Sequence, residues 1–581
     1  MLGTHPVLPL SRRGEVDWEA WRSGGVATCW GVRSHLVTLA AARDVPGTRG
    51  ALRGTNRPTM TVDLLIRGGT VLDGLGHPGT RADVAIQGER IVAVGPCDQL
   101  AARETLDASG LVVAPGFVDL HTHSDGWLLR TGNFEVKTRQ GFTTEVLMAD
   151  GISYAPVRDW NAAEWIFYLR SLNGLRLDHY RGWESLADYQ RELDRNTAQN
   201  SLLQIPYANV RVNALGWGRQ APDDYQAREI RAAIREGMAQ GAAGLSTGLD
   251  YIAQCFATTG ELVEACRAMA DRGGLYVTHV RYKQGLRRAV EEAVEIAERA
   301  GVALHISHLK ASSGLDVDQT LELIDWARQR VDLTFDVYPY QPGSTMLNFL
   351  IPNECWERGP LGVLERLREP AIRDRFAAGL AAYDLDLDEI HIAWTQSKDN
   401  AVHQGKLLSQ YVAETGLSAA DALCNLLLEE RLAVLLVFNQ GDDRLVEPFL
   451  QHDLYLMGSD GIYFDDGAVH PRIAGSAARL LGACVRDRQL FALEEGVRKL
   501  TSGPARRFGL KDRGELRPGA FADVVVFDPR TIADQATYER PHQFATGVRD
   551  VLVNGTAVVR GGEPLPFTRG QAPGRALKFR E

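Results

Sequence analysis

Histidine and aspartate residues stand at the ends of several apolar runs, where their side chains can bind a metal ion. His121 and His123 follow the run VAPGFVDL, and residues i and i+2 of an extended strand point to the same face. His279 ends GLYVTH, His308 ends ALHISH and Asp460 ends LYLMGSD. Imidazoles and carboxylates are common zinc ligands, and a divalent metal lowers the pKa of water from 15.7 to about 7. The set predicts a metal site that supports hydrolysis.

A single histidine at a strand end is more often a hydrogen-bonded core residue than a metal ligand. His305 stands three residues before His308 and so faces the other side of an extended strand; we expect it in the core. The metal hypothesis therefore depends on a fold that brings the separate run ends together.

The central part of the chain alternates short β-rich runs with amphipathic helical stretches. The helical stretches AREIRAAIREGMAQGA and LRRAVEEAVEIAERAG carry apolar residues at i, i+3, i+4 and i+7. This alternation is typical of βα units, and in a (β/α)8 barrel the carboxyl ends of the strands converge on one face. Nine runs are candidate strands, one more than such a barrel needs: VAPGFVDLHTH, TTEVLMAD, LLQIPYANV, AAGLSTG, GLYVTH, ALHISH, VDLTFDVYPY, EIHIAW and LYLMGSD.

Strand patterns also flank this central part on both sides. MTVDLLIRGGTVLDG begins at Met60, and VLVNGTAVV places Asn554-Gly555 where a type I′ hairpin turn needs positive φ. With DVAIQGERIVAVG and ADVVVFDP, they predict one small sheet domain built from both ends of the chain. Residues 1–59 show no sustained period, so we expect a loosely structured extension. Met60 would then be the natural start, and a regulatory arm is the alternative.

Length and composition exclude several classes of protein. A chain of 581 residues needs at least two structural units. With 64 Lys plus Arg against 74 Asp plus Glu, the net charge is −10, and the sequence has no long basic run. Binding to nucleic acid or to an anionic membrane is therefore not expected. Seven scattered cysteines without a CxxC pair, and no secretory or membrane-spanning pattern, favour a cytoplasmic protein that binds a small molecule.

Several motifs together resemble one family of enzymes. GFVDLHTHSD is similar to the first metal motif of the amidohydrolase superfamily. The N-acyl-D-amino-acid deacylase (D-aminoacylase) family is indicated by GAAGLSTGLDY, YVTHVR, ISHLK, DVYPYQPGST, GSDG, HPR and LTSGPARRFGLKDRGELRPGAFADVVVFDP. The resemblance runs from about Met60 to the C-terminus. It implies zinc-dependent hydrolysis of the N-acyl group of a D-amino acid, with one or two zinc ions or another divalent metal.

The same resemblance implies an architecture with defined parts. A distorted TIM (β/α)8 barrel would span residues 114–510, and a small β-sandwich would combine residues 60–113 with residues 511–581. An insertion around residues 351–432 would cover the site as a lid or form a peripheral helical layer.

The resemblance also assigns roles to individual residues. His279 and His308 look like ligands of the tightly held zinc, His121 and His123 like the second metal position, and Asp460 like the catalytic aspartate. Where the family commonly has a cysteine ligand in a GNCG turn, TTEVLMADGISYAP places Asp150. A carboxylate can replace the thiolate but changes the metal preference. Glu145, five residues earlier, is the less favoured substitute.

Other residues are candidates for binding the substrate. Lys310 lies two residues after His308, on the same face of an extended strand, and resembles the family's lysine that binds the substrate carboxylate. Tyr340 and Arg472 are further candidates, whereas we expect Tyr338 to pack. Ser246 in GLSTG matches GxSxG, but no helix pattern follows it, so a serine nucleophile is not favoured.

Two other functions remain open from the sequence. A cyclic-amide hydrolase of the dihydroorotase or hydantoinase kind usually needs a carboxylated lysine at a strand end, and Lys283 and Lys310 instead follow ligands. An inactive scaffold would normally have lost ligands that this chain retains. The acyl group, the accepted side chain, the stereochemistry and the oligomeric state are not determined by the sequence.

Overall fold

The computed structural model describes residues 61–581 except 313, 383–384 and 440. The expected extension over residues 1–59 and the start at Met60 lie outside the described residues. Residues Thr59–Glu581 form one unit, and the description below concerns this unit alone.

Parallel strands, all from the central part of the chain except β22 near the C-terminus, form two sheets. One sheet has the order β22-β8-β7-β6, and the other the order β17-β13-β12-β11-β10-β9. The first contains β6 (Phe117–Asp119), β7 (Phe142–Leu147), β8 (Asn200–Leu203) and β22 (Ala576–Leu577). The second contains β9 (Ile205–Pro206), β10 (Gly244–Gly248), β11 (Leu275–His279), β12 (Ala303–Ile306), β13 (Leu333–Val337) and β17 (Tyr455–Met457).

The strand pairing does not join these two sheets into one closed sheet, but backbone hydrogen bonds connect them at two places. The amide of Leu120, after β6, donates to the carbonyl of Met457 in β17 over 3.3 Å. The amide of Ala243, before β10, donates to the carbonyl of Leu203 in β8 over 2.9 Å. The carboxyl ends of strands from both sheets therefore lie near one another.

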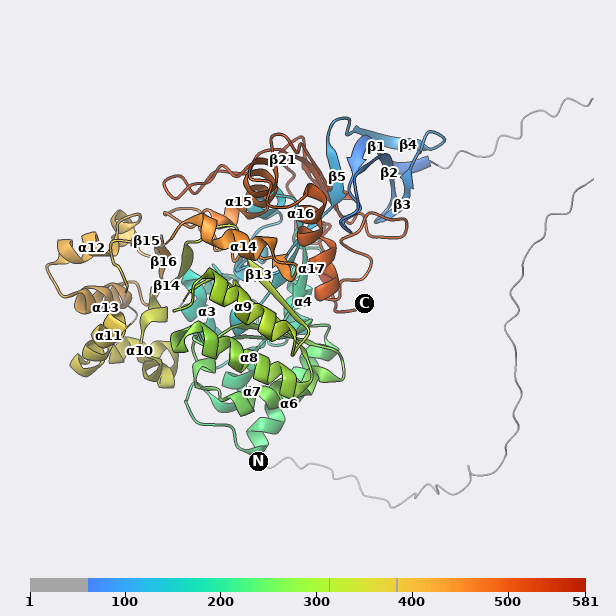
Figure 1. The fold of residues 1–581 in the computed structure, drawn as a ribbon. Helices are drawn as coiled ribbons and strands as arrows, with labels where there is room; N and C mark the ends of the chain where they lie inside the picture. The colour runs from blue at the N-terminus through green and yellow to red at the C-terminus, as the bar shows by residue number, and fades with distance from the viewer. Residues whose placement is uncertain (1–60, 313, 383–384, 440) are drawn as a thin grey trace, which may run out of the picture. The chain divides into compact units, whose positions relative to one another are not determined.

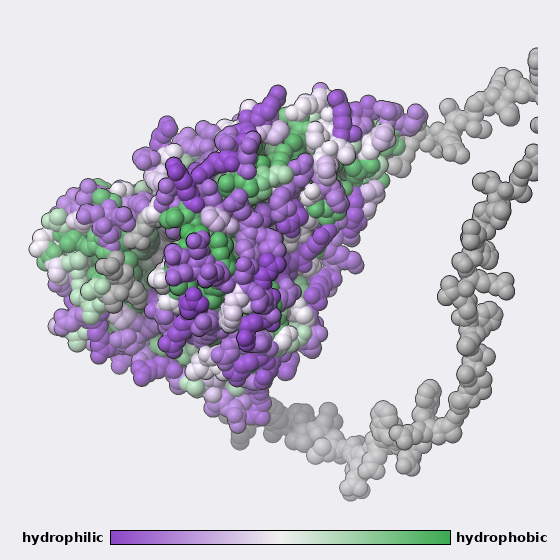
Figure 2. Space-filling model, in the orientation of Figure 1, coloured by the Kyte–Doolittle hydropathy of each residue, from purple (hydrophilic) through white to green (hydrophobic). Residues whose placement is uncertain are grey.

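Amphipathic helices follow the strands and bury one face each. In Figure 1 the helices α7, α8 and α9 lie side by side, and Figure 2 shows a mainly hydrophilic surface over this region. The helix α8 buries Leu286, Val290 and Val294, the spacing that the sequence pattern predicted. The helices are α6 (Asp224–Ala239), α7 (Thr259–Ala270), α8 (Leu286–Ala300) and α9 (Val317–Arg328).

Shorter helices complete this part of the chain. The segment YANVRVNALGW, to which the sequence assigned no role, contains α5 (Tyr207–Leu215). The others are α1 (Asp125–Leu128), α2 (Glu135–Thr138), α3 (Ala162–Tyr168), α4 (Leu186–Leu193), α14 (Glu447–Gln451), α15 (Arg472–Arg479), α16 (Leu493–Leu500) and α17 (Ser502–Arg507).

Strands from both ends of the described chain share a nine-stranded sheet. Its order is β21-β20-β19-β18-β5-β1-β2-β3, with β4 beside β1. The junction between the two ends is the antiparallel pair β5 and β18, in which Val113 stands opposite Val526. The strands are β1 (Thr61–Val71), β2 (Thr80–Gln87), β3 (Arg90–Gly95), β4 (Ala101–Asp107), β5 (Val112–Pro115), β18 (Val524–Phe527), β19 (Val548–Val553), β20 (Thr556–Arg560) and β21 (Glu563–Pro564).

The expected hairpin turn is present between β19 and β20. Asn554 has φ 48° and Gly555 has φ 77°, both in the left-handed region that the type I′ turn requires.

One of the nine candidate strands, a number one greater than a barrel needs, lies outside the parallel sheets and within the expected insertion around residues 351–432. EIHIAW forms β15 (Ile390–Thr395), which pairs antiparallel with β16 (Val434–Phe438); β14 (Gly343–Met346) pairs with the other side of β16. The sequence did not show which candidate is the surplus one, because a short apolar run looks alike in parallel and antiparallel sheets. In Figure 1 this sheet lies beside α10 (Gly359–Arg366), α11 (Pro370–Ala382), α12 (Leu408–Thr415) and α13 (Ala419–Glu429).

Candidate metal centre and substrate site

The predicted metal ligands lie at or just beyond the carboxyl ends of strands. His121 and His123 follow β6, and Asp150 lies in the short turn Ala149–Gly151 after β7. His279 is the last residue of β11, His308 follows β12, and Asp460 follows β17. Their side chains are buried, except that the side chain of His308 is 13% exposed.

Short distances join these side chains into one cluster. The Nε2 atom of His121 lies 3.5 Å from Asp150 Oδ1 and 3.6 Å from Asp460 Oδ1. The Nε2 atom of His123 lies 3.2 Å from Asp460 Oδ1, and that of His308 lies 3.9 Å from Asp150 Oδ1. Two groups of three offer ligand atoms that all lie within 4.8 Å of one another: His121, His123 and Asp460, and His121, Asp150 and His308.

Two atoms of the cluster show that a metal ion fits it. His121 Nε2 and Asp150 Oδ1 are buried and have no hydrogen-bond partner. Buried polar atoms are normally paired, because leaving one unpaired costs roughly 1 to 3 kcal/mol. A cation bound by both atoms removes this cost, and imidazole and carboxylate donors suit zinc. His279 Nδ1, 3.0 Å from His308 Nε2, adds a further imidazole beside the second group.

Three polar residues that the sequence analysis missed hold these imidazoles in place. Asp336 Oδ2 lies 3.5 Å from His121 Nδ1, Asp250 Oδ2 lies 3.3 Å from His279 Nε2, and Asn173 Oδ1 lies 3.0 Å from His123 Nδ1. Such partners fix the orientation of metal-binding histidines. Asp336 and Asp250 follow apolar runs, in VDLTFDVYPY and GAAGLSTGLDY, a signal that could have found them. Asn173 lies in a segment without a comparable pattern.

The backbone is unusual at three of the predicted ligands. Asp150, His308 and Asp460 have φ values of 57°, 38° and 49°. Residues other than glycine adopt this region rarely, and such positions cluster at functional sites. The fold thus holds these side chains in a conformation that the isolated chain disfavours.

Burial and mutual charge set the protonation of the cluster. Burial opposes charge on His121, but Asp336, Asp150 and Asp460 outweigh it and raise its pKa well above the usual value. Burial also opposes charge on Asp460, yet Arg472 and the imidazoles hold its pKa well below the usual range. Burial, with His279, lowers the pKa of His308 to about 4. The carboxylates are therefore ionised and His308 is neutral at pH 7, the forms in which these groups bind metals.

A basic group borders the cluster on the side of Asp460. Arg472 is fully buried, and its Nη1 atom lies 2.9 Å from Asp460 Oδ2. Lys310 Nζ donates to the hydroxyl of Tyr338 over 3.0 Å and to the carbonyls of Gln341 and Pro342. The Tyr338 ring contacts both cations, with its centroid 4.6 Å from Lys310 Nζ and 4.4 Å from Arg472 Cζ. The expected packing role of Tyr338 thus includes contact with both basic groups.

Tyr340 and several further residues are placed away from the cluster. The Tyr340 hydroxyl donates to Asp534 Oδ2 over 3.2 Å, so its contact with substrate stays a prediction. Glu145 accepts a hydrogen bond from Ser124 Oγ over 2.6 Å and belongs to neither metal group. Ser246 Oγ donates to the carbonyl of Met148 over 2.6 Å, and the buried His305 pairs with Asp336 over 2.9 Å. Both contacts are structural.

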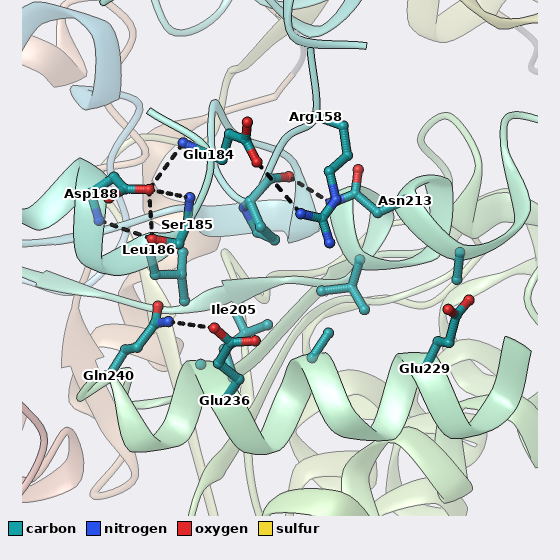
Figure 3. A pocket seen from close by; sticks show the side chains of 15 residues that line it. Arg158, Glu184, Ser185, Leu186, Asp188, Ile205, Asn213, Glu229, Glu236 and Gln240 are labelled. Atoms are coloured by element: carbon teal, nitrogen blue, oxygen red, sulfur yellow. Dashed lines mark hydrogen bonds and ion pairs between the residues drawn. The ribbon is translucent and has the colours of Figure 1, made fainter. Parts of the chain in front are cut away.

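A separate cavity of about 260 Å³ lies between α4, α5 and α6 and contains none of the predicted site residues. Figure 3 shows Arg158 reaching toward Glu184, with Glu229 and Glu236 on the helix opposite. The Arg158 Nη1 atom lies 3.5 Å from Glu184 Oε2, and Gln240 pairs with Glu236. No histidine or cysteine lines this cavity. The cluster is therefore the better candidate for a metal site.

Comparison with known proteins decides the family. The family model described as "Amidohydrolase family" matches residues 104–336 and 451–559. D-aminoacylase of Alcaligenes xylosoxydans xylosoxydans is 36% identical over 520 residues, which are 89% of this chain and 97% of that protein. The chain belongs to the amidohydrolase family. The resemblance of its motifs to the D-aminoacylases is thereby confirmed.

Two more relatives of this amidohydrolase bear on its chemistry. N-acyl-D-glutamate deacylase of the same organism is 35% identical over 526 residues, covering 89% of this chain and 96% of that protein. The solved structure of N-acyl-D-glutamate deacylase from Bordetella bronchiseptica contains zinc and a phosphonate inhibitor that mimics the tetrahedral intermediate. It is 32% identical, with a TM-score of 0.74, and the match covers 89% of this chain and all 100% of that one.

Membrane insertion has no support in the part of the chain that the structure describes. Every helix there is too short or too polar to cross a bilayer.

Proposed function

We propose that the protein is a metal-dependent hydrolase that cleaves the amide bond of N-acyl-D-amino acids to a carboxylic acid and a free D-amino acid. The observation that carries this function is the buried cluster of four imidazoles and two carboxylates beside Arg472, in a chain 36% identical to a D-aminoacylase. Zinc, as one or two ions, suits the donors, and another divalent metal is compatible with Asp150.

The residues of the cluster divide the work of hydrolysis. His121, His123, Asp150, His279, His308 and Asp460 would hold the metal. When bound, zinc lowers the pKa of water and polarises a carbonyl oxygen. Asp460 is ionised and borders both histidines that follow β6, so it can accept a proton and later return it to the leaving amine. Arg472 fixes the other carboxylate oxygen of Asp460.

The basic group beside the cluster supplies recognition. An N-acyl amino acid carries a free carboxylate, and Lys310 and Arg472 lie within 4.6 Å and 4.4 Å of the same tyrosine ring. Lys310 binds this carboxylate in the proposed complex, with Arg472 and Tyr340 as further contacts. Charge-assisted hydrogen bonds of this kind are stronger than neutral ones.

The proposed architecture is a distorted (β/α)8 barrel over residues 114–510 with a small β-sandwich from residues 60–113 and 511–581. The two parallel sheets, linked by hydrogen bonds at Leu120 and Ala243, support the barrel. The nine-stranded sheet, with strands from both ends, supports the second part. Residues 351–432, largely helical, form the insertion.

The proposed location is the cytoplasm, with small-molecule substrates as partners rather than nucleic acid or membrane. The six cysteines that lie among the described residues are free and buried, which suits a reducing compartment.

The alternative functions make different demands on the site. In the described structure, Lys283 Nζ donates to the carbonyl of Phe349 and Lys310 Nζ to those of Gln341 and Pro342, so neither bridges the metal groups. This argues against a cyclic-amide hydrolase of the kind that uses a carboxylated lysine. An inactive scaffold would not need the complete ligand set.

The test is to offer the metal-loaded enzyme N-formyl, N-acetyl and longer N-acyl derivatives of D- and L-amino acids, and cyclic amides, and to measure the released products. Release of D-amino acids supports the proposal. Exclusive hydrolysis of cyclic amides, or no hydrolysis of any substrate, would overturn it. Asp460→Asn should lower kcat by roughly 100-fold or more, because proton transfer is lost, while the enzyme stays folded.

A further inference from the structure

A network of buried polar groups lies directly behind the metal ligands. Lys137, on α2, donates from Nζ to the carboxylate of Asp119 and to Ser459 Oγ, the latter over 2.6 Å. Asp119 is the last residue of β6, and Ser459 directly precedes Asp460. The side chains of Lys137, Asp119 and Ser459 are all fully buried.

The network joins the two segments that carry the ligands. Asp119 Oδ1 accepts from the amide of Ser459 over 2.9 Å and from the amide of His121 over 3.3 Å. Asp119 Oδ2 accepts from Ser459 Oγ over 2.6 Å. The amide of Asp460 in turn donates to the carbonyl of His121 over 2.7 Å. The Asp119 carboxylate therefore bonds to both the end of β6 and the turn that carries Asp460, in addition to the backbone hydrogen bonds that join these segments.

The turn itself needs such support because its backbone is strained. Asp460 has φ 49°, which the isolated residue disfavours. On its far side, the amide of Gly461 donates to Ser459 Oγ over 3.1 Å. A Cβ atom added to Gly461 would meet Ile473 Cδ1 at 2.6 Å and Lys137 Nζ at 3.2 Å. Lys137 thus packs against the turn as well as bonding to it.

A buried lysine–carboxylate pair contributes little to the free energy of unfolding by itself. Removing two charges from water is costly, and a well-packed apolar pair of similar size is often at least as stable as a buried ion pair. Lys137 instead has a specific geometric effect: its ammonium bonds at once to Asp119 and to Ser459, and so ties β6 to the turn.

We infer that Lys137 is a positioning residue, which acts through Asp119 and Ser459 to hold Asp460 and His121 in register. It touches neither the ligand atoms nor the proposed substrate group. The inference rests on the proposed role of Asp460 in hydrolysis. It adds Lys137, a residue outside the site, as a group on which the position of the Asp460 carboxylate depends.

Two variants test the network without leaving Asp119 as a lone charge in the core; the second also removes the cation 4.0 Å from the buried Glu145 Oε2. Ser459→Ala keeps the Lys137–Asp119 ion pair but removes the hydroxyl that connects it to the turn. The double variant Lys137→Met with Asp119→Asn removes both charges together, because Lys137→Met alone would leave an unpaired buried carboxylate. The matched control is Lys499→Met: Lys499 is also buried, but its Nζ donates to the carbonyl of His452, away from the cluster.

The readouts are kcat and KM, zinc affinity by competition with a chelator, and the melting temperature. For both network variants we expect kcat to fall by about 10- to 100-fold, with KM changed less than about threefold, and zinc affinity to fall by about 10- to 100-fold, the usual scale for groups that orient ligands. Lys499→Met should lower the melting temperature yet keep kcat and zinc affinity near the wild-type values.

The inference is overturned if both network variants keep wild-type kcat and zinc affinity, or if Lys499→Met lowers both quantities as much as they do. The zinc titration needs no substrate, so it still decides the matter if the wild-type enzyme fails to hydrolyse N-acyl-D-amino acids. Failure of the proposed function is then seen in the wild type alone.

Discussion

The carboxylate of Asp150 stands at the position where the resemblance to the D-aminoacylase motif implies a cysteine. Its Oδ1 atom accepts no hydrogen bond and lies 3.5 Å from His121 Nε2. A role as a turn cap would instead require its oxygens to accept backbone N–H bonds. The unpaired oxygen beside two imidazoles therefore favours metal binding, with a preference for harder ions than a thiolate would give.

Replacement of Asp150 should change both the amount and the identity of bound metal. We expect Asp150→Ala to release most of the metal, and Asp150→Cys to restore binding with a shift from manganese toward zinc, because thiolates prefer zinc. Metal analysis after dialysis against equimolar zinc and manganese measures both effects. Full retention of metal and activity by Asp150→Asn would show that the carboxylate is not a ligand.

The charge on Lys310 should make substrate binding depend on pH. Burial, and then the neighbouring Arg472, lower the pKa of Lys310 to about 7. Its ammonium is therefore present below this pH and lost above it, so KM for an N-acyl-D-amino acid should rise between about pH 6 and pH 8. The corresponding N-acyl amide, which lacks the carboxylate, should show no such rise.

Substitution of Lys310 provides the matching test. Lys310→Met should lower kcat/KM for the acid by roughly 10- to 100-fold, the scale of a hydrogen bond to a charged group, and should affect the amide little. Equal losses on the acid and the amide would assign Lys310 a structural role.

The residues that the structure brings into one cluster are those in which polar groups end apolar runs. His121, His279 and Asp460 stand at such ends, so their types and positions were visible in the sequence. The role of Lys137 could not be predicted from the sequence, because a lysine four positions before a glycine turn is normally expected to be exposed to solvent. Its burial depends on three segments that meet only in the folded chain.

At the level of elements, the turn after β7 is packed against β10 without room for a larger residue. Gly151 has φ 66°, and an added Cβ would meet Gln254 Oε1 at 2.3 Å, Thr247 Cα at 2.7 Å and Ser246 O at 2.8 Å. Two of these three atoms belong to the backbone, which cannot easily move. The left-handed backbone conformation of the neighbouring Asp150 is therefore maintained by packing of this turn against β10, and not by a conformational preference of aspartate.

Gly151→Ala should consequently destabilise the protein and weaken metal binding. We expect a cost of about 2 to 5 kcal/mol, from the left-handed φ together with overpacking. Gly182→Ala is the matched control, because Gly182 has φ +82° but no atom within 4 Å of an added Cβ. Its expected cost is about 1 to 2 kcal/mol without loss of metal. Denaturation and zinc titration of both variants measure the difference, and equal zinc affinities would contradict the packing argument.

The elements themselves were predictable to different degrees. The spacing of Leu286, Val290 and Val294 identified α8, and Asn554-Gly555 identified the hairpin turn. The run EIHIAW was recognised as a strand, but its sheet was not predictable, because alternation and length do not specify a strand's partner. That choice is made by β16, whose residues Leu435, Leu436 and Val437 are fully buried between β14 and β15.

At the scale of the whole described unit, polar residues connect the parallel sheets to the nine-stranded sheet. Asn200 of β8 donates from Nδ2 to Asp523 Oδ2 over 3.2 Å, and Asn554 donates from Nδ2 to Asn200 Oδ1 over 2.8 Å. Asp523 also accepts from the amide of Asn554 over 2.8 Å and forms an ion pair with Arg513. The sequence placed these residues in separate motifs, and only the fold makes them one junction.

The junction should therefore contribute strongly to stability. Asp523→Ala leaves the Arg513 guanidinium buried without its carboxylate and removes two further hydrogen bonds, and breaking a buried pair in this way costs about 3 to 5 kcal/mol. The matched control is Asp528→Ala, whose partner Arg530 has a side chain 75% exposed; exposed pairs contribute about 0 to 1 kcal/mol. Thermal and urea denaturation should show a large loss for Asp523→Ala and a small one for Asp528→Ala. Because the junction lies away from the ligand cluster, the folded fraction of Asp523→Ala at low temperature should still bind zinc with wild-type stoichiometry. Similar small losses for both variants would show that apolar contacts between the sheets, such as that of the Phe117 ring in β6 with the Phe527 ring in β18, rather than this polar junction, hold them together.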